Sequence, residues 1–473
     1  FRYVEVQGFP GVPTHESIEG RVVQDSMFPT ADFVSSNKLL NQIHSNIYWG
    51  VRGNYRSIPT DCPQRDERQG WLGDRSVVCR SESYLFDVAA FYTKWETDLA
   101  DSQLPTGSIP DVSPAYWHLY NDDVTWPSTF IQVPAMLYDQ YGDLRVIERN
   151  YDSMKKWVEH MRGFVKNGLM PKDTYGDWCV PPEDPKLIHS KDPALQTEGQ
   201  LLGTAYYYWM VRQMSRFAQL LGKQEDAAEY AAFAEKIKAA FNAKYLNPST
   251  GLYGNGTQTS SILPLTFGLT PAENRARLTA GLTARIENES KGHVGTGLVG
   301  AQWLMRALTE NGRADVAYQI ATQTTYPGLG YMVSKGATTV WELWNGDTAD
   351  PAMNSGNHVM QIGDLGVWLY EYLGGIRPDS ENPGFKHILI RPYMVKGLSS
   401  VKTSHRSMYG LISSEWSRNG NNVTLNVTIP ANTTAAVWLP SSDAGRVRES
   451  GQPVKKAHDV AFLRTEDGAA VYE

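Results

Sequence analysis

Cysteine is scarce in this sequence: 473 residues contain only Cys62, Cys79 and Cys179. Three thiols cannot form a disulfide framework, and none stands at the C-x-x-C spacing typical of zinc and redox sites. Long apolar runs are also missing, since no stretch approaches the roughly 18 apolar residues that a membrane span needs. The first residues lack the charged and apolar regions of a signal peptide. We therefore expect buried thiols and a soluble protein with no membrane span, whose export signal, if one exists, lies outside this sequence.

Basic clusters are equally rare. The 44 Lys and Arg residues are outnumbered by 51 Asp and Glu residues, which gives a formal net charge of −7. A mildly acidic chain without a basic block is a poor match for nucleic acid or anionic lipid. The sequence also lacks the H-E-x-x-H, G-x-S-x-G, P-loop and G-x-G-x-x-G motifs, which argues against metalloproteases, serine hydrolases and nucleotide-binding enzymes. We expect no nucleic-acid partner, no metal and no cofactor.

Aromatic residues, in contrast, are abundant: 14 Trp, 25 Tyr and 14 Phe, many of them close to carboxylates along the sequence. Such pairs suit carbohydrate, because the C–H faces of a sugar stack on rings while its hydroxyls bind carboxylates. Large helical cores also use many aromatic residues, so composition alone leaves both interpretations open.

The spacing of apolar residues divides the chain into three predicted domains. Residues 1–34 contain two alternating stretches, 1–6 and 18–23, which predict the terminal strands of an N-terminal β-domain followed by a linker. Residues 35–378 have apolar residues three and four apart, which predicts ten to twelve helices, the first capped by the Ser35–Ser36 pair. A ring of six helical hairpins would close such an array, and an open helical solenoid is the alternative.

The third predicted domain, residues 379–473, changes to a period of two. Glycine and asparagine break this region into hairpins. The predicted strands begin near Ile388, Val401, Leu411, Val423 and Ala435. This pattern predicts a C-terminal β-sandwich with a supporting role.

The strongest local signal lies between Ile58 and Asp74. This run combines prolines, glycines and Trp71 with charged residues, namely Asp61, Arg65, Asp66, Glu67, Arg68 and Asp74. A structural network of ion pairs explains these charges as well as an acid site does. A carboxyl group beside Trp in a partly dry pocket would have a raised pKa, as a general acid requires at neutral pH.

A second acid stands among tryptophans 275 residues later, where Glu342 lies between Trp341 and Trp344. Glycoside hydrolysis needs two carboxyl groups facing each other across a sugar, and loops of a closed helical ring can bring such distant residues together. The alternative is that Glu342 caps a helix beside a Trp cluster.

Two weaker signals follow the same logic. Asp177 beside Trp178 repeats the pairing of carboxylate and ring, although a turn with a buried Trp explains it equally well. His358 stands alone in a predicted exposed turn, and a lone His is usually not a ligand.

Taken together, these motifs resemble those of the bacterial α-L-rhamnosidases of glycoside hydrolase family 78. The run from Asp61 to Asp74 resembles the signature of that family, and Gly336–Glu342 resembles its second catalytic segment. The resemblance covers about residues 1–395. It implies a mainly α fold, with an (α/α)6 catalytic barrel flanked by strands of an N-terminal β-domain and by a C-terminal β-sandwich.

The resemblance also implies an activity and a set of site residues. The family hydrolyses terminal α-L-rhamnose of carbohydrate substrates by an exo-acting, inverting and metal-independent mechanism. Glu67 would be the general acid and Glu342 the general base, with carboxyls roughly 6.5–9.5 Å apart. Asp66 could exchange roles with Glu67. The residues implied in rhamnose binding are Asp61, Arg65, Trp71, Asp74, Trp126, Asp177, Trp178, Trp341, Trp344 and His358.

One position departs from the family pattern. Ser128 stands where many members carry an acid, and the loss of a carboxylate there would suit an anionic neighbouring sugar or a sulfated rhamnose. Two alternative functions stay open. One is another (α/α)6 carbohydrate-active enzyme, such as a different glycosidase or a polysaccharide lyase, and the other is a sugar-binding relative with an inactive site.

Overall fold

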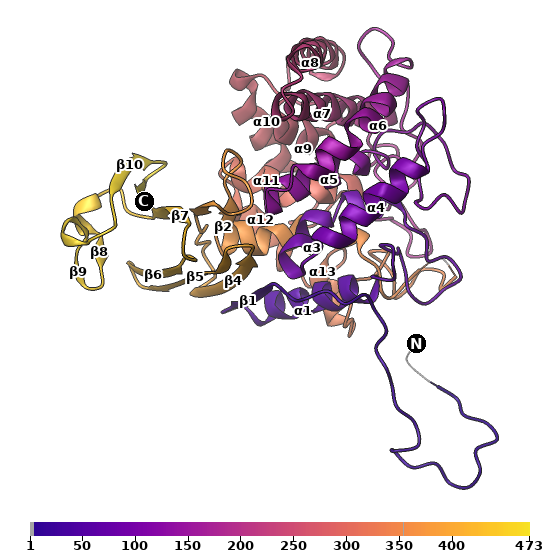
Figure 1. The fold of residues 1–473 in the computed structure, drawn as a ribbon, viewed down its shortest axis with the longest axis horizontal. Coiled ribbons are helices and arrows are strands. Elements are labelled where there is room, and N and C mark those ends of the chain that lie inside the picture. The colour runs from indigo at the N-terminus through magenta and orange to yellow at the C-terminus, as the bar shows by residue number, and fades with distance from the viewer. Residues whose placement is uncertain (1–3, 353) are drawn as a thin grey trace.

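The computed structural model describes residues 4–352 and 354–473 (Figure 1). The middle of the chain is helical, and the C-terminal part forms strands that lie beside the helices. Within the described residues, no helix is both long and apolar enough to cross a bilayer. All three cysteines are buried and free, as predicted.

The helices pack as hairpins around a shared interior, which is the predicted six-hairpin (α/α)6 barrel. Antiparallel neighbours such as α7 (Gly199–Leu220) and α8 (Gln224–Tyr245) are joined by short turns. The other helical elements are α1 (Lys38–Gly53), α2 (Leu72–Ser76), α3 (Cys79–Leu85), α4 (Ala89–Asp101), α5 (Thr129–Tyr141), α6 (Arg145–Arg162), α9 (Gln258–Phe267), α10 (Ala272–Ala284), η1 (Arg285–Glu289), α11 (Leu298–Glu310), α12 (Ala314–Ala321), α13 (Leu329–Ser334), η2 (Met360–Ile362), α14 (Leu365–Val367) and η3 (Trp368–Leu373).

Helix α1 is capped by Asn37 rather than by the predicted Ser35–Ser36 pair. The Asn37 side chain accepts hydrogen bonds from two N–H groups of the first turn. Ser35 is the last residue of strand β1 (Ala31–Ser35), and its N–H and hydroxyl both bind the Asn41 side chain. Because α1 begins at Lys38, Asn37 occupies the cap position, and Ser35 and Ser36 lie too far before the first turn to cap it.

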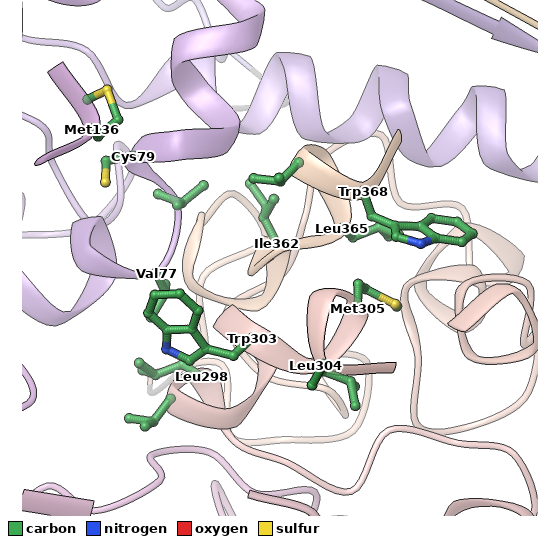
Figure 2. Packing of buried hydrophobic residues seen from close by; sticks show 14 of the residues in the cluster. Val77, Cys79, Met136, Leu298, Trp303, Leu304, Met305, Ile362, Leu365 and Trp368 are labelled. Carbon is green, nitrogen blue, oxygen red and sulfur yellow. The ribbon is translucent and has the colours of Figure 1, made fainter. Parts of the chain in front are cut away.

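The barrel interior is a continuous apolar core, part of which Figure 2 shows. Two of its tryptophans have their indole N–H groups hydrogen-bonded inside the core. The Trp303 indole N–H donates to Tyr206 at 2.9 Å, and the Trp368 indole N–H donates to Thr309 at 2.9 Å. Burial of such a side chain contributes about 1.5–3 kcal/mol. These contacts join α7, α11 and η3, and they give the loops at the helix ends a rigid base.

Two larger sheets and a two-stranded sheet, β8-β9, form the C-terminal β-domain. A four-stranded sheet has the order β1-β4-β5-β6, and a five-stranded sheet has the order β10-β11-β7-β3-β2. The five predicted strands correspond to β3 (His387–Ile390), β4 (Ser400–Ser407), β5 (Gly410–Asn419), β6 (Asn422–Thr428) and β7 (Thr434–Leu439). The sequence did not reveal β2 (Ile376–Pro378), β8 (Arg448–Glu449), β9 (Gln452–Pro453), β10 (Phe462–Glu466) and β11 (Ala469–Tyr472), which are short and show little alternation.

The prediction for the N-terminal residues is partly wrong. Residues 18–23 are exposed and form no strand, because alternation forms a strand only where a partner strand lies beside it, and none does among the described residues. Residues 4–6 are exposed and irregular as well, and 1–3 lie outside the described residues. The first strand is β1, which pairs antiparallel with β4 and so extends a sheet of the C-terminal β-domain.

The β-domain and the barrel share one interface. The Trp416 indole N–H donates to the Leu373 C=O at 2.7 Å, and the Tyr84 hydroxyl donates to the Ile376 C=O at 3.1 Å. At Gly374 a Cβ atom would overlap the Thr403 side chain, so the close approach of barrel and sheet requires glycine. The β-domain thus packs firmly on the last barrel helix.

Candidate active site

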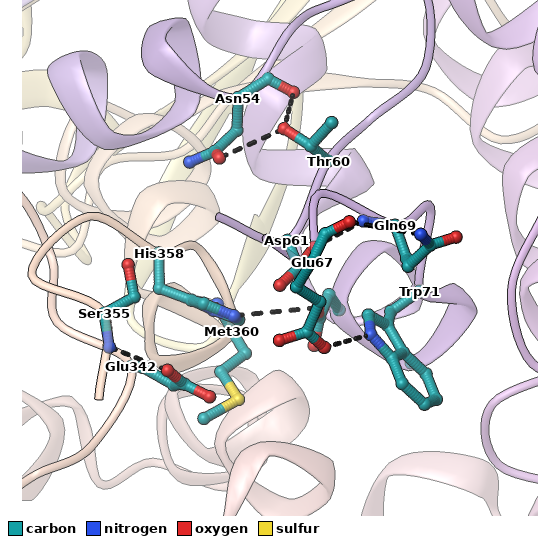
Figure 3. Close-up of polar contacts among 12 residues, drawn as sticks. Asn54, Thr60, Asp61, Glu67, Gln69, Trp71, Glu342, Ser355, His358 and Met360 are labelled. Carbon is teal, nitrogen blue, oxygen red and sulfur yellow. Dashed lines mark hydrogen bonds and ion pairs between the residues drawn. The ribbon is translucent and has the colours of Figure 1, made fainter. Parts of the chain in front are cut away.

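The segment between α1 and α2 is an irregular loop that carries four predicted site residues, Asp61, Arg65, Glu67 and Trp71 (Figure 3). The loop closes on itself, because the Asp61 N–H donates to the Gln69 C=O at 3.0 Å and the Gln69 N–H donates to Asp61 Oδ1 at 2.8 Å. Within the turn, Arg68 has a φ of 51°, a conformation that few residues other than glycine adopt. The closed turn holds Arg65 and Glu67 close together.

One guanidinium group joins the two candidate catalytic acids. Arg65 Nη1 and Nη2 donate to the two carboxylate oxygens of Glu342 at 2.8 and 3.2 Å. Arg65 Nε and Nη2 also lie 2.8 and 2.6 Å from Glu67 Oε2. Contacts of this kind fix the geometry of their carboxylates. Glu67 and Glu342 therefore face the same group in the folded chain.

Glu342 lies on a second irregular segment, which is held by hydrogen bonds. The Glu342 N–H donates to the Ser355 C=O at 2.9 Å, and the Ser355 N–H donates to Glu342 Oε2 at 2.8 Å. The Gln361 side chain donates to the Glu342 C=O at 3.1 Å. No helix starts at Glu342 in the described part of the chain, so the alternative role of a helix cap is wrong.

Glu67, and not its neighbour Asp66, faces this centre. The Trp71 indole N–H donates to Glu67 Oε1 at 2.8 Å, and the Glu67 side chain is 20% exposed. The Asp66 side chain is fully exposed and pairs with Arg68 at 3.0 Å. Because Asp66 points into solvent, the alternative in which it exchanges roles with Glu67 does not fit the structure.

Asp61 brings a buried carboxylate to the same centre. Its side chain is 2% exposed, and Arg65 Nη2 lies 3.8 Å from Oδ2. Burial raises the pKa of Asp61 to about 6, and a hydrogen bond from the Cys62 thiol opposes this rise. Among the described residues Oδ2 has no hydrogen-bond partner. This oxygen can therefore accept a hydrogen bond from a bound molecule.

Asp74 and His358 form a second buried pair beside the acids. His358 Nε2 lies 3.8 Å from Asp74 Oδ2. Burial, together with the positive charges of Arg65 and Arg75, lowers the pKa of His358 to about 3. Burial, followed by the charge of Asp61, raises the pKa of Asp74 well above its usual value. His358 is thus neutral at neutral pH, and it lies in a buried pocket rather than in the predicted exposed turn.

Three potential metal ligands also converge here. Asp61, Cys62 and Glu67 each place one ligand atom within 4.8 Å of the others. Burial, followed by the Asp61 charge, raises the pKa of the Cys62 thiol well above its usual value. A thiol binds metal as thiolate, and the Arg65 cation already neutralises Glu67. The chemistry of this cluster therefore favours a guanidinium over a divalent cation.

Aromatic rings extend from Glu67 along one side of the site. Trp71 packs edge-to-face on Tyr175, with ring centroids 6.2 Å apart, and Tyr175 stacks on Trp126 at 4.5 Å. A Cβ atom at Gly73 would overlap the Trp126 ring, so glycine lets this ring pack against α2. The predicted residues Trp71 and Trp126 therefore belong to one continuous aromatic wall.

Four other predicted residues are partly or fully buried, namely Asp177, Trp178, Trp341 and Trp344. Both Asp177 oxygens are used inside the protein, since Thr259 and the Gly300 N–H donate to them at 2.5 and 3.0 Å. Trp344 is buried and lines a small apolar cavity, and Trp341 is also buried. Trp178 is half-buried, with its ring 5.0 Å from that of His189. The structure thus does not bring Asp177 or Trp344 to the Arg65 centre as free groups.

Ser128 does not face the site either. It is fully buried before α5, where its hydroxyl donates to the Thr125 C=O at 2.5 Å and accepts from the Gln132 side chain at 2.7 Å. The Ser128 hydroxyl therefore makes no contact with a bound sugar. The effect of the missing carboxylate on an anionic neighbouring sugar stays a prediction.

Comparison with protein families now places the chain. The family model for the bacterial α-L-rhamnosidase six-hairpin glycosidase domain matches residues 29–373, and the model for the C-terminal domain of these enzymes matches residues 375–453. The chain belongs to this family. The family match thus supports both the barrel and the β-domain that follows it.

Relatives within the α-L-rhamnosidase family align along almost the entire chain. An α-L-rhamnosidase of Streptomyces avermitilis is 37% identical, over 100% of this chain and 44% of that protein. An α-L-rhamnosidase of Formosa agariphila is 33% identical, over 98% of this chain and 50% of that protein. The chain spans about half the length of the curated relatives it matches.

Solved α-L-rhamnosidase structures have the same fold. The Streptomyces avermitilis enzyme, crystallised with L-rhamnose, superposes with a TM-score of 0.90 at 36% identity, over 98% of this chain and 43% of that chain. The α-L-rhamnosidase from Dictyoglumus thermophilum gives a TM-score of 0.87 at 35% identity, over 98% and 51% of the two chains. This likeness confirms the predicted fold class.

Several residues of this rhamnosidase-family site were not found by sequence reasoning. Ser355 and Gln361 hold Glu342, and the Tyr175 hydroxyl donates to Asp111 Oδ2 at 2.9 Å. Burial raises the pKa of Asp111 to about 7. Tyr175 and Ser355 stand close to predicted residues, two positions before Asp177 and three before His358. The others have ordinary sequence surroundings, and no local pattern marks them.

Proposed function

We propose that this chain holds the catalytic site of an exo-acting, inverting α-L-rhamnosidase, which hydrolyses terminal α-L-rhamnose from glycosides, oligosaccharides or polysaccharides. The observation that carries the proposal is the joint contact of Arg65 with Glu67 and Glu342. Two carboxyl groups that meet at one binding position are what glycosidic hydrolysis needs. The choice of sugar is supported by the relatives, which are α-L-rhamnosidases, one of them solved with L-rhamnose.

Glu67 is the general acid in this proposal. Its proton passes to the glycosidic oxygen while the bond from that oxygen to the anomeric carbon breaks, so the leaving group departs as a neutral alcohol. The Trp71 N–H binds Glu67 Oε1 and so orients the carboxyl group. An acid held in one orientation loses less entropy when the transition state forms.

Glu342 is the general base. It takes a proton from a water molecule while the water oxygen bonds to the anomeric carbon on the face opposite the leaving group. The product is therefore β-L-rhamnose. The Ser355 N–H and the two Arg65 contacts hold Glu342 in place for this step.

The buried polar groups bind the hydroxyls of the sugar. Asp61 Oδ2 accepts one hydroxyl, because this oxygen is otherwise without a partner among the described residues. His358 Nδ1 accepts from the Met360 N–H at 3.3 Å, which assigns the proton of the neutral ring to Nε2. Nε2 therefore faces Asp74 as a donor, and the Asp74 carboxyl group can accept or donate. The buried pair discriminates hydroxyl positions by hydrogen bonding.

The aromatic residues complete the pocket in two ways. Trp71, Trp126, Trp178 and Trp341 offer ring surface for the C–H groups and the methyl group of rhamnose. Asp177 and Trp344 act as supports, since Asp177 binds α9 and α11 and Trp344 packs on the core. This assignment predicts that changes at Asp177 and Trp344 alter stability as well as activity.

Proton NMR of the chain acting on an aryl α-L-rhamnopyranoside tests the proposal. We expect β-L-rhamnose as the first product, before mutarotation. Initial α-L-rhamnose would make Glu342 a nucleophile instead of a base. An unsaturated sugar product, seen as a vinylic proton in the same spectra, would indicate a lyase, and binding of rhamnose without turnover would indicate an inactive sugar-binding relative.

Matched variants test the two roles separately. Glu67→Gln and Glu342→Gln should each lower kcat by about 10² to 10⁴, because each removes one proton transfer. Asp66→Asn is the matched control, since Asp66 adjoins Glu67 but points into solvent, and it should keep wild-type activity. An unchanged kcat in either Gln variant would refute the role of that residue.

A further inference from the structure

Outside the pocket, a turn with two exposed aromatic side chains lies close to the candidate general acid. Residues 114–118 form a turn in which Tyr116 is 79% exposed and Trp117 is 36% exposed. Most large aromatic side chains of the chain are buried, and these two stand out because they adjoin the site. Exposed rings next to a catalytic pocket are typical of surfaces that bind a ligand.

The base of this turn is fixed to the loop that carries Glu67. The Ser113 N–H donates to the Gly70 C=O at 2.9 Å, and the Leu72 N–H donates to the Asp111 C=O at 2.9 Å. Between these two hydrogen bonds, Trp71 and Val112 pair as an isolated antiparallel bridge. The turn therefore keeps a set position relative to Glu67, although its tip is exposed.

A chain of contacts leads from the acid to the tip. Glu67 Oε1 accepts from the Trp71 indole, and the Trp71 ring packs edge-to-face on Trp117 with centroids 6.0 Å apart. Glu67 donates its proton to the leaving oxygen in the proposed reaction, so the leaving group lies next to Glu67. Of the two rings that pack on Trp71, Trp117 is the more exposed.

We propose that Tyr116 and Trp117 form a platform on which a ring of the leaving group stacks. The inference rests on the proposed function, which places the leaving oxygen at Glu67. Residues 112–121 contain no Asp, Glu, Lys or Arg, so the platform suits an uncharged ring. Both an aromatic ring and the apolar face of a sugar have this chemistry. The platform thus selects the leaving group, whereas the pocket selects the rhamnose.

The test compares three substrates: methyl α-L-rhamnoside, phenyl α-L-rhamnoside and a rhamnosyl-glucose disaccharide. Trp117→Ala should lower kcat/KM about three- to tenfold for a substrate with a leaving-group ring, mainly through KM. The methyl compound should change less than about twofold, because it has nothing to stack. A loss with the phenyl compound alone identifies an aromatic leaving group, and a loss with the disaccharide alone identifies a sugar.

Control variants separate this role from a structural one. Trp117→Phe keeps a flat ring and should restore most of the loss, and Trp49→Ala removes a 46% exposed Trp on α1 and should leave all three substrates unchanged. Equal losses with all three substrates in Trp117→Ala would mean that Trp117 only supports Trp71, which overturns the inference. No loss with any substrate overturns it as well, and the proposed function then still stands. A wild-type chain that cleaves none of the three refutes both.

Discussion

Arg65 Nη1 donates to Glu342 Oε2 at 2.8 Å, although the two residues are 277 positions apart in the sequence. The same guanidinium contacts Glu67, so a single positive charge holds an acid from each of two loops. Arg65 and Glu67 share one loop, so it is Glu342, on the other segment, that gains this partner only when the chain folds. The relationship makes the geometry of the site depend on closure of the whole helical ring.

Replacement of Arg65 is the most direct test of this relationship. Arg65→Lys should lower kcat about 100-fold or more, because an ammonium group cannot make the paired contacts that a planar guanidinium makes with two carboxylates. Steady-state kinetics on an aryl α-L-rhamnoside would measure the loss. Arg68→Lys is the matched control, since Arg68 forms only an exposed pair with Asp66. A kcat for Arg65→Lys within about threefold of wild type would contradict the prediction.

Replacement of Trp71 by Phe should separate the contribution of the indole N–H to catalysis from that of the aromatic ring. The variant keeps an aromatic surface but cannot donate to Glu67 Oε1. We expect kcat to fall about ten- to 100-fold while KM changes little, because the lost hydrogen bond orients the acid in the transition state. Thermal unfolding should show a nearly unchanged Tm. A large rise in KM with unchanged kcat would show instead that Trp71 acts in binding.

Asp61 should make stability depend on pH. Burial raises the pKa of Asp61 from its usual value of 3.8 to about 6 in the folded chain. Between these values the folded chain keeps a proton that the unfolded chain has lost. The stability linked to this group is therefore fully present below about pH 4 and is lost as pH rises through about 6.

The variant Asp61→Asn tests this dependence, because its side chain does not ionise. Relative to wild type, its free energy of unfolding should rise by about 2–3 kcal/mol between pH 4 and pH 7. Urea unfolding at several pH values would measure the difference. The same difference at both ends of the range would show that Asp61 does not titrate as the buried geometry indicates.

Glycine 73 should tolerate no side chain. A Cβ atom there would overlap the Trp126 ring, and both residues are buried. Gly73→Ala should therefore lower the free energy of unfolding by about 1–3 kcal/mol, as is usual for an overpacked core, and should also lower kcat/KM. Gly20→Ala is the control, because nothing lies within 4 Å of a Cβ atom there. Urea unfolding of both variants would decide, and equal stabilities would mean that the Trp126 ring moves aside freely.

Local sequence patterns were sufficient for most of the long helices and for the middle strands. The apolar spacing in α1 and α11 follows the helical period, and Gly142 ends α5 in the left-handed conformation with a φ of 67°. These features depend on neighbours a few positions away. Residues 18–23 show the limit of such patterns, since their alternation has no partner strand in the described part of the chain and they stay irregular.

Some features of the site could likewise be predicted from local sequence, and others could not. The acids to consider could be read from the sequence, because Glu67 and Glu342 each stand in a distinctive run of charged and aromatic residues. That Arg65 joins them, that Asp66 points into solvent and that Asp177 binds inward became clear from the folded chain alone. Neighbours in sequence can face opposite directions, whereas residues that meet across the barrel are brought together by packing of the entire helical ring.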